Sequence, residues 1–172
     1  WNFGILPGVS YSSDVGALFG AITTTFNYGD GKIYPNYYDR LYVKGSYTTK
    51  RMGTIRVYYD SDYAIKDHKL AVDLSYIADA LYDFYGFNGS QSIYNHNWID
   101  NKSSDYVSKV FYRQQSNLFR SSVDICGKIS GHWDWMGGIG VLNFKESRVR
   151  NGLLKNVPDS DSVPELWKLY ND

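Results

Sequence analysis

The feature that most constrains this chain is an alternation of apolar and polar residues that recurs in several segments of similar length. It is clearest between Thr54 and Tyr63, where odd positions are mostly apolar and even positions carry Arg56, Asp60 and Asp62. Successive side chains of a strand point to opposite faces, so one face of such a strand meets an apolar medium and the other meets water. Repeated strands of this kind, with aromatic residues near their ends, are typical of the wall of a transmembrane β-barrel.

The aromatic content agrees with that interpretation. The 172 residues include 17 Tyr, 8 Phe and 5 Trp, yet the mean hydropathy is negative at -0.42. A soluble domain would bury most of these rings, whereas a barrel places Tyr and Trp at the two water interfaces and exposes only every second residue to lipid. No run of about 18 apolar residues is present, which excludes a transmembrane helix.

Seven segments carry the strand pattern in sequence order, so we predict an all-β, antiparallel up-and-down meander. They cover about residues 3–12, 17–28, 41–49, 54–63, 70–77, 111–129 and 133–144. In the second segment Leu18, Ile22, Phe26 and Tyr28 form the apolar face. The polar stretch at about 83–105 is predicted to be a long loop of the extracellular type. From about 145 to 172 the alternation ends, and 163–169 can form a short helix.

Seven consecutive strands leave two unpaired edges, and unpaired backbone groups are not tolerated in hydrocarbon. Single-chain bacterial barrels also have even numbers of strands. We therefore expect residues 1–172 to form one partial barrel domain, the first part of a larger barrel. A chain that begins at Trp1 is a mature protein or a piece of a longer one.

The opening segment from Ile5 to Gly20, with Pro7, Tyr11, Asp14 and Gly16 in that order, resembles the first barrel hairpin of the bacterial surface antigen family, the BamA/TamA-type outer-membrane proteins. The segments 84–89 (Phe-Tyr-Gly-Phe-Asn-Gly) and 112–114 (Tyr-Arg-Gln) resemble the shorter, Bacteroidetes-like members. The resemblance implies a sixteen-strand barrel in the bacterial outer membrane that inserts or translocates other outer-membrane proteins. Its implied partners are outer-membrane lipids, client proteins and accessory assembly subunits.

Charged residues on the wet face are predicted to line the hydrated interior of the barrel. They are Lys44, Arg56, Asp60, Asp62, Asp73, Arg120, Asp124 and Lys128. The carboxylate pair Asp60 and Asp62 has the residue types of a general acid and base, but alternation alone predicts a wall of mixed charge.

We predict no catalytic residue, no cofactor and no metal ion, and hence no enzyme activity. His68, His96 and His132 are far apart, and Ser121 and Ser122 lack a nucleophile elbow. The formal net charge of zero argues against nucleic acid, and the single Cys126 excludes an internal disulfide.

The first strand is predicted to be the weakest seam of the completed barrel. Pro7 has no amide hydrogen to donate, and Gly4 and Gly8 add backbone freedom without packing area. Weak pairing there would let the wall open and offer an edge to an incoming strand. The same position forms the gate that the family resemblance implies.

Two other classes of function remain open at this point. One is a small outer-membrane pore or barrel enzyme of eight strands, which predicts a final strand near Trp167 to Tyr170. The other is a soluble, sugar-binding β-sandwich, in which Trp133 and Trp135 would stack on a sugar ring. An interfacial girdle of aromatic residues explains these two tryptophans with fewer assumptions.

Overall fold

The computed structural model describes residues 1–13, 15–87, 89, 92–149 and 166–171. Within these residues the chain is almost entirely β-structure, with a 3-10 helix, η1, and a short helix, α1. The elements are β1 (Asn2–Ser12), β2 (Gly16–Asn27), β3 (Asp39–Thr48), β4 (Gly53–Ile65), β5 (His68–Asp83), η1 (His96–Trp98), β6 (Arg113–Ser130), β7 (Trp133–Ser147) and α1 (Leu166–Asn171).

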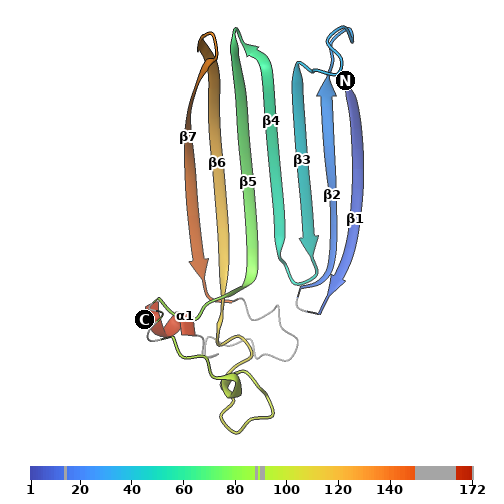
Figure 1. The fold of residues 1–172 in the computed structure, drawn as a ribbon. Helices are drawn as coiled ribbons and strands as arrows, with labels where there is room; N and C mark the ends of the chain where they lie inside the picture. The colour runs from blue at the N-terminus through green and yellow to red at the C-terminus, as the bar shows by residue number, and fades with distance from the viewer. Residues whose placement is uncertain (14, 88, 90–91, 150–165, 172) are drawn as a thin grey trace. The chain divides into compact units, whose positions relative to one another are not determined.

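The seven strands form one sheet in sequence order, from β1 at one edge to β7 at the other (Figure 1). β1 pairs with β2, β2 with β3 and β3 with β4, and each of these pairs is antiparallel. The predicted all-β, up-and-down meander is therefore confirmed. The sheet does not close on itself, because β1 and β7 each have one neighbour.

Most strand boundaries lie within two residues of their predicted positions, but β5 does not. It continues to Asp83, six residues beyond its predicted end at Ile77. The seventh strand also reaches Ser147, so the predicted tail without strand begins about three residues too early at 145. The predicted helix at 163–169 overlaps α1, and its first three residues lie outside the described part of the chain.

Two of the hairpins are joined by two-residue turns that require a left-handed backbone. Asp67 has φ 61° in the turn between β4 and β5, and Gly131 has φ 56° in the turn between β6 and β7. Positive φ in a two-residue turn matches the right-handed twist of the flanking strands.

The described residues group into two compact units. The first comprises residues 1–49, 53–77 and 118–144, which hold β1 to β4 and most of β5, β6 and β7. The second comprises residues 50–52, 78–117 and 145–172. Each unit is described by itself below.

The register of the first unit determines which side chains share a face of the sheet. Val43 pairs with Val57, and Lys44 pairs with Arg56. Directly paired residues lie on the same face, so odd positions of β3 and β4 form an apolar face and even positions form a charged face. The odd positions of β1, including Phe3 and Ile5, fall on the apolar face through their pairing with Thr25 and Thr23.

The assignment of the second strand's apolar residues to the apolar face of the sheet is wrong. Ile22 pairs with Lys44, and Phe26 pairs with Arg40, so both lie on the charged face. The loop at 28–38 sets this register, and a shift of one residue would exchange the two faces of β2. The alternation within one strand separates its two faces, but it does not show which face of the neighbouring strand each of them continues. The Tyr37 ring packs against Phe26 with 5.2 Å between ring centroids and thereby covers part of this apolar stripe.

The buried apolar residues of the described chain lie in the second unit and not in the sheet of the first. They are Ala80, Phe84, Val110, Phe111, Tyr112 and Val149. The Phe84 amide donates to the Tyr112 carbonyl at 2.9 Å, and the Tyr112 hydroxyl donates to the Ile93 carbonyl at 3.0 Å. Arg113 donates to the Leu81 carbonyl at 2.9 Å and also pairs with Asp83.

These contacts bring together the two segments, 84–89 and 112–114, that carry the resemblance to Bacteroidetes-like barrels. Tyr85 packs on Tyr112 at 5.4 Å, and Trp98 packs on Phe111 at 5.3 Å between ring centroids. The connection between β5 and β6 is therefore a packed aromatic unit. It extends to residue 112, seven residues beyond the predicted end of the loop at 105.

Gly20 and its partner Gly8 provide a matched test of the β2–β3 register. A Cβ at Gly20 would lie 2.9 Å from the Gly45 carbonyl oxygen, whereas a Cβ at Gly8 would meet nothing within 4 Å. We expect Gly20→Ala to lower the free energy of unfolding by about 1–3 kcal/mol through overpacking. Gly8→Ala should leave it nearly unchanged. Denaturant titration of the two variants measures the difference, and equal effects would contradict the register.

Candidate functional site

The candidate site is the charged face of the sheet in the first unit, where strands β3 to β6 place cations against carboxylates. Asp73 in β5 lies at its centre. Arg56 donates to both oxygens of Asp73, from Nε at 3.0 Å and from Nη2 at 2.6 Å. Arg120 in β6 approaches the same carboxylate at 3.5 Å. Three of the predicted interior charges are thus in contact, because Arg56 of β4 and Arg120 of β6 both approach the Asp73 carboxylate of β5.

A second ion pair joins β3 to β4, and a hydrogen bond to it holds the loop between β2 and β3 on the charged face. Arg40 Nε donates to Asp60 Oδ1 at 2.6 Å, and the Tyr37 hydroxyl donates to Asp60 Oδ2 at 2.9 Å. Burial raises the pKa of the Tyr37 phenol, and its hydrogen bond to the Asp60 carboxylate raises that pKa further. Tyr37 therefore stays protonated and acts as a donor that holds the loop on the sheet.

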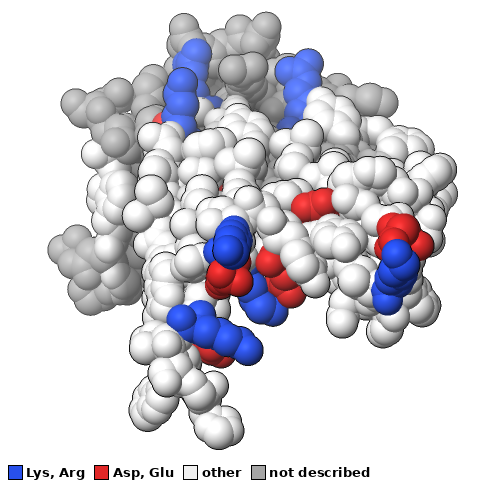
Figure 2. Space-filling view, turned by 90° about the horizontal axis from the view of Figure 1, so that it is seen from above, with Lys and Arg blue, Asp and Glu red and all other residues white. Residues whose placement is uncertain are grey.

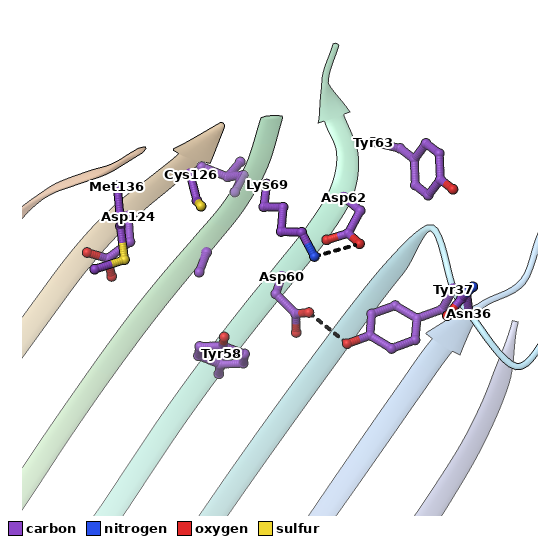
Figure 3. A pocket seen from close by; sticks show the side chains of 12 residues that line it. Asn36, Tyr37, Tyr58, Asp60, Asp62, Tyr63, Lys69, Asp124, Cys126 and Met136 are labelled. Carbon is purple, nitrogen blue, oxygen red and sulfur yellow. Dashed lines mark hydrogen bonds and ion pairs between the residues drawn. The ribbon is translucent and has the colours of Figure 1, made fainter. Parts of the chain in front are cut away.

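Next to this pair the charged face is hollowed (Figure 3). The hollow has a volume of about 450 Å³. Its lining includes Asp60 and Asp62 of β4, and Asp124 and Cys126 of β6. Lys69 approaches Asp62 at 3.2 Å. Gly138 of β7 leaves the space in which the Asp124 carboxylate lies, because a Cβ at residue 138 would overlap it.

Opposite charges lie beside one another on this part of the molecule. Seen from above in Figure 2, several carboxylates adjoin a Lys or Arg side chain. Asp60 and Asp62, the pair that invites an acid–base reading, are each held by a cation. Among the described residues no group of three or more His, Cys, Asp or Glu side chains could hold a metal ion.

The structure therefore brings together seven of the eight predicted interior charges. Asp60, Asp62 and Asp124 line one hollow, and Arg56, Asp73 and Arg120 form one cluster, while Lys44 lies opposite Arg56 in the register. Lys128 makes no ion pair with another described residue.

Sequence reasoning missed Arg40, Tyr37 and Lys69 in this network. Arg40 precedes the predicted start of the third strand by one residue, and its even position would have placed it beside Lys44 on the charged face. Lys69 likewise precedes the predicted fifth strand by one residue. Tyr37 lies in a loop, where no periodicity indicates the direction of a side chain.

The predicted seam residues Gly4, Pro7 and Gly8 all lie in β1, at the edge of the sheet. Every residue of β1 is exposed. Pro7 pairs in register with Ala21, and the Thr23 hydroxyl donates to the Gly4 carbonyl at 3.0 Å. This strand has β2 as its one neighbour.

Comparisons with known proteins give no assignment: no family model, no curated protein and no solved structure matches this chain. Among the described residues, no helix combines the length and the apolar character needed to cross a membrane.

We expect Asp73→Asn to destabilise the sheet more than Asp62→Asn. The Asp73 side chain is 14% exposed and accepts from two guanidinium groups, whereas Asp62 is 49% exposed and has one lysine partner. Loss of charge-assisted bonds at Asp73 should cost about 1–3 kcal/mol. The exposed pair at Asp62 is worth less than about 1 kcal/mol.

Thermal and denaturant unfolding of the two variants provides the measurement. Asp62→Asn is the matched control because it changes the same chemical group on the same face. A smaller loss for Asp73→Asn than for Asp62→Asn would show that Asp73 does not organise the charged face.

Proposed function

We propose that this chain forms part of the wall of a bacterial outer-membrane β-barrel. The observation that carries the proposal is the contrast between the two faces of the sheet in the first unit. One face exposes large apolar side chains from strand to strand, and the other face holds the ion pairs around Asp60 and Asp73. The exposed apolar side chains include Phe3, Ile5, Val9, Phe19, Ile55, Leu74, Phe119, Val123, Ile139 and Val141.

A sheet in water would have the opposite arrangement. Its apolar face would be covered by another layer of the protein, since large exposed apolar patches are unfavourable in water. The buried residues described in the first unit are Gly16, Thr48, Ser61, Ser75 and Gly127, none of which has a large apolar side chain. The apolar face therefore needs an apolar medium, and lipid on one side with a hydrated interior on the other satisfies both faces.

Amphipathic aromatic residues toward the ends of the strands support the same proposal. The rings of Tyr38, which precedes β3, and Tyr63, near the end of β4, pack 4.6 Å apart. Toward the opposite ends of their strands, Tyr11 and Tyr47 are exposed. Tyrosine favours the membrane–water interface, where its ring meets lipid and its hydroxyl meets water.

Trp135 has a similar role in the proposal. Its ring lies 5.6 Å from that of His68 across Gly127, where a Cβ would come within 2.7 Å of both side chains. Because Gly127 has no side chain, His68 of β5 and Trp135 of β7 can contact each other above β6. An interfacial girdle accounts for this contact without a sugar ligand.

The open edges of the sheet support a role in a larger barrel. Edge backbone groups of β1 and β7 must be paired in hydrocarbon, so further strands are needed to complete the wall. With the family resemblance, this supports an assembly barrel that inserts or translocates other outer-membrane proteins. Outer-membrane lipids, client proteins and accessory subunits are then its partners, and β1 is the seam at which a client strand would pair.

Cysteine labelling tests the orientation of the two faces. Single cysteines replace Val57, Tyr59, Val72, Leu74, Val123 or Ile125 on the apolar face, in a Cys126-free complete gene product in outer-membrane fractions. The same scan replaces Arg56, Asp60, Asp73, Arg120, Asp124 or Lys128 on the charged face. A membrane-impermeant thiol reagent should label the charged-face positions and spare the apolar-face positions.

Equal labelling at Val57 and Asp60 would remove the membrane proposal, because it would place both faces in water. As an independent measure, Val123→Arg should lower the free energy of unfolding by about 2–4 kcal/mol if residue 123 lies near the bilayer midplane. Purification of the protein from the aqueous phase as a folded monomer without detergent would instead favour the soluble sandwich.

Hydrogen exchange tests the proposed seam. Amides of Ile5 to Tyr11 in β1 should exchange faster than those of Val43 to Thr48 in β3, because β1 pairs through fewer hydrogen bonds. A disulfide that locks the first strand to the last in the complete barrel should block client insertion. Equal protection of the two strands, or normal insertion by the locked protein, would exclude the seam as a gate.

A further inference from the structure

A second hollow on the charged face is lined almost entirely by groups that favour a negative charge. It has a volume of about 380 Å³ and is lined by Thr24 of β2, Arg40 and Tyr42 of β3, and Arg56 and Tyr58 of β4. Thr24, Tyr42 and Tyr58 stand side by side across three strands, because Tyr42 pairs with both of the others. No carboxylate of a described residue lines this hollow.

The two guanidinium groups both lie close to one tyrosine ring. Arg40 Cζ lies 5.4 Å and Arg56 Cζ lies 5.8 Å from the Tyr58 ring centroid. Each arginine is fixed by its own carboxylate, Arg40 by Asp60 and Arg56 by Asp73. Arg40 bonds to its carboxylate through Nε, and Arg56 bonds to its carboxylate through Nε and Nη2. Each guanidinium therefore keeps further N–H donors, because arginine has five.

The surroundings of the hollow have an excess of positive charge. Arg40, Lys44, Arg56 and Arg120 are four cations, and Asp60 and Asp73 are their two carboxylates. Lys44 lies directly opposite Arg56 in the register, and it makes no ion pair with another described residue. Two like charges directly opposite one another on a sheet are unfavourable, and Asp73 compensates the charge of Arg56 alone in this pair.

Neutral donors are also available. The side chains of Thr24 and Tyr42 make no hydrogen bond to another described residue, so both hydroxyls are free to donate. Arginine presents parallel N–H groups that match the two oxygens of a carboxylate or a phosphate. The arrangement of two fixed arginines, a nearby lysine and two free hydroxyls thus has the composition of an anion site.

We propose that this hollow binds an oxyanion, the carboxylate or phosphate group of a ligand that enters the charged face. Arg40 and Arg56 supply charge-assisted hydrogen bonds, Thr24 and Tyr42 supply neutral ones, and Lys44 supplies the remaining positive charge. The proposal rests on the geometry of the hollow, and it does not depend on whether the charged face lines a barrel or meets bulk water.

Titration with two probes, inorganic phosphate and succinate, tests the proposal. Binding to the folded protein is followed by NMR of the arginine side-chain N–H groups and by the unfolding midpoint, with sodium chloride at matched ionic strength as the reference. We expect a saturable response to at least one probe and none to chloride. Saturation by phosphate alone, by succinate alone or by both identifies which oxyanion the hollow accepts.

Three variants locate the site without removing a member of an ion pair. Thr24→Val and Tyr42→Phe each remove one hydroxyl donor and Lys44→Gln removes one positive charge, and each should weaken binding about tenfold, the factor expected from the loss of one interaction with an ionised ligand. Lys128→Gln is the matched control, since it removes the same charge from β6, whereas the hollow is lined by residues of β2 to β4 and Lys44 lies directly opposite its lining residue Arg56.

Two results would overturn the proposal. One is a response to phosphate and succinate that never saturates and follows ionic strength alone. The other is equal weakening by Lys44→Gln and Lys128→Gln, together with no effect of Thr24→Val and Tyr42→Phe. The unfolding midpoint of each variant without added oxyanion shows whether it is folded before its binding is compared.

Discussion

The continuous antiparallel ladder from β1 to β7 is the constraint on which the other features of the sheet depend. Because each ladder pair places two side chains on the same face, the register of one hairpin fixes the environment of every residue in both strands. The pair Lys44 and Arg56 and the pair Val43 and Val57 are adjacent rungs of β3 and β4. One rung belongs to the charged face and the next to the apolar face, so a slip of one residue would exchange them.

The charged face is organised around carboxylates that are shared between strands. Asp73 accepts from Arg56 and Arg120, and Asp60 accepts from Arg40 and Tyr37. Such links connect strands through their side chains in addition to the ladder. They also hold Arg40 and Arg56 close to Tyr58, where both line the hollow proposed to bind an oxyanion. The same ion pairs thus stabilise the sheet and position the donors of the proposed oxyanion site.

The two units differ in the way that they exclude water. The second unit buries Phe84, Val110, Phe111 and Tyr112 against one another, as a small soluble core does. The sheet of the first unit buries no comparable apolar cluster, and its large apolar side chains stay exposed. A single chain therefore contains a loop unit with its own core and a sheet whose apolar face needs an external apolar medium. This contrast is the physical basis of the proposed membrane location.

The sequence by itself determined the strands, their order and the division of most strands into two faces, because period-two alternation is a local property of the backbone. It also predicted the charge cluster from parity, since Arg56, Asp73 and Arg120 alternate with apolar neighbours. Only the tertiary structure decided that Ile22 and Phe26 lie on the charged face, because the β2–β3 register depends on the path of the loop at 28–38. It alone placed Tyr37 on Asp60 and packed Phe84 and Tyr85 against Tyr112, because loop side chains follow no period and their partners are distant in the sequence.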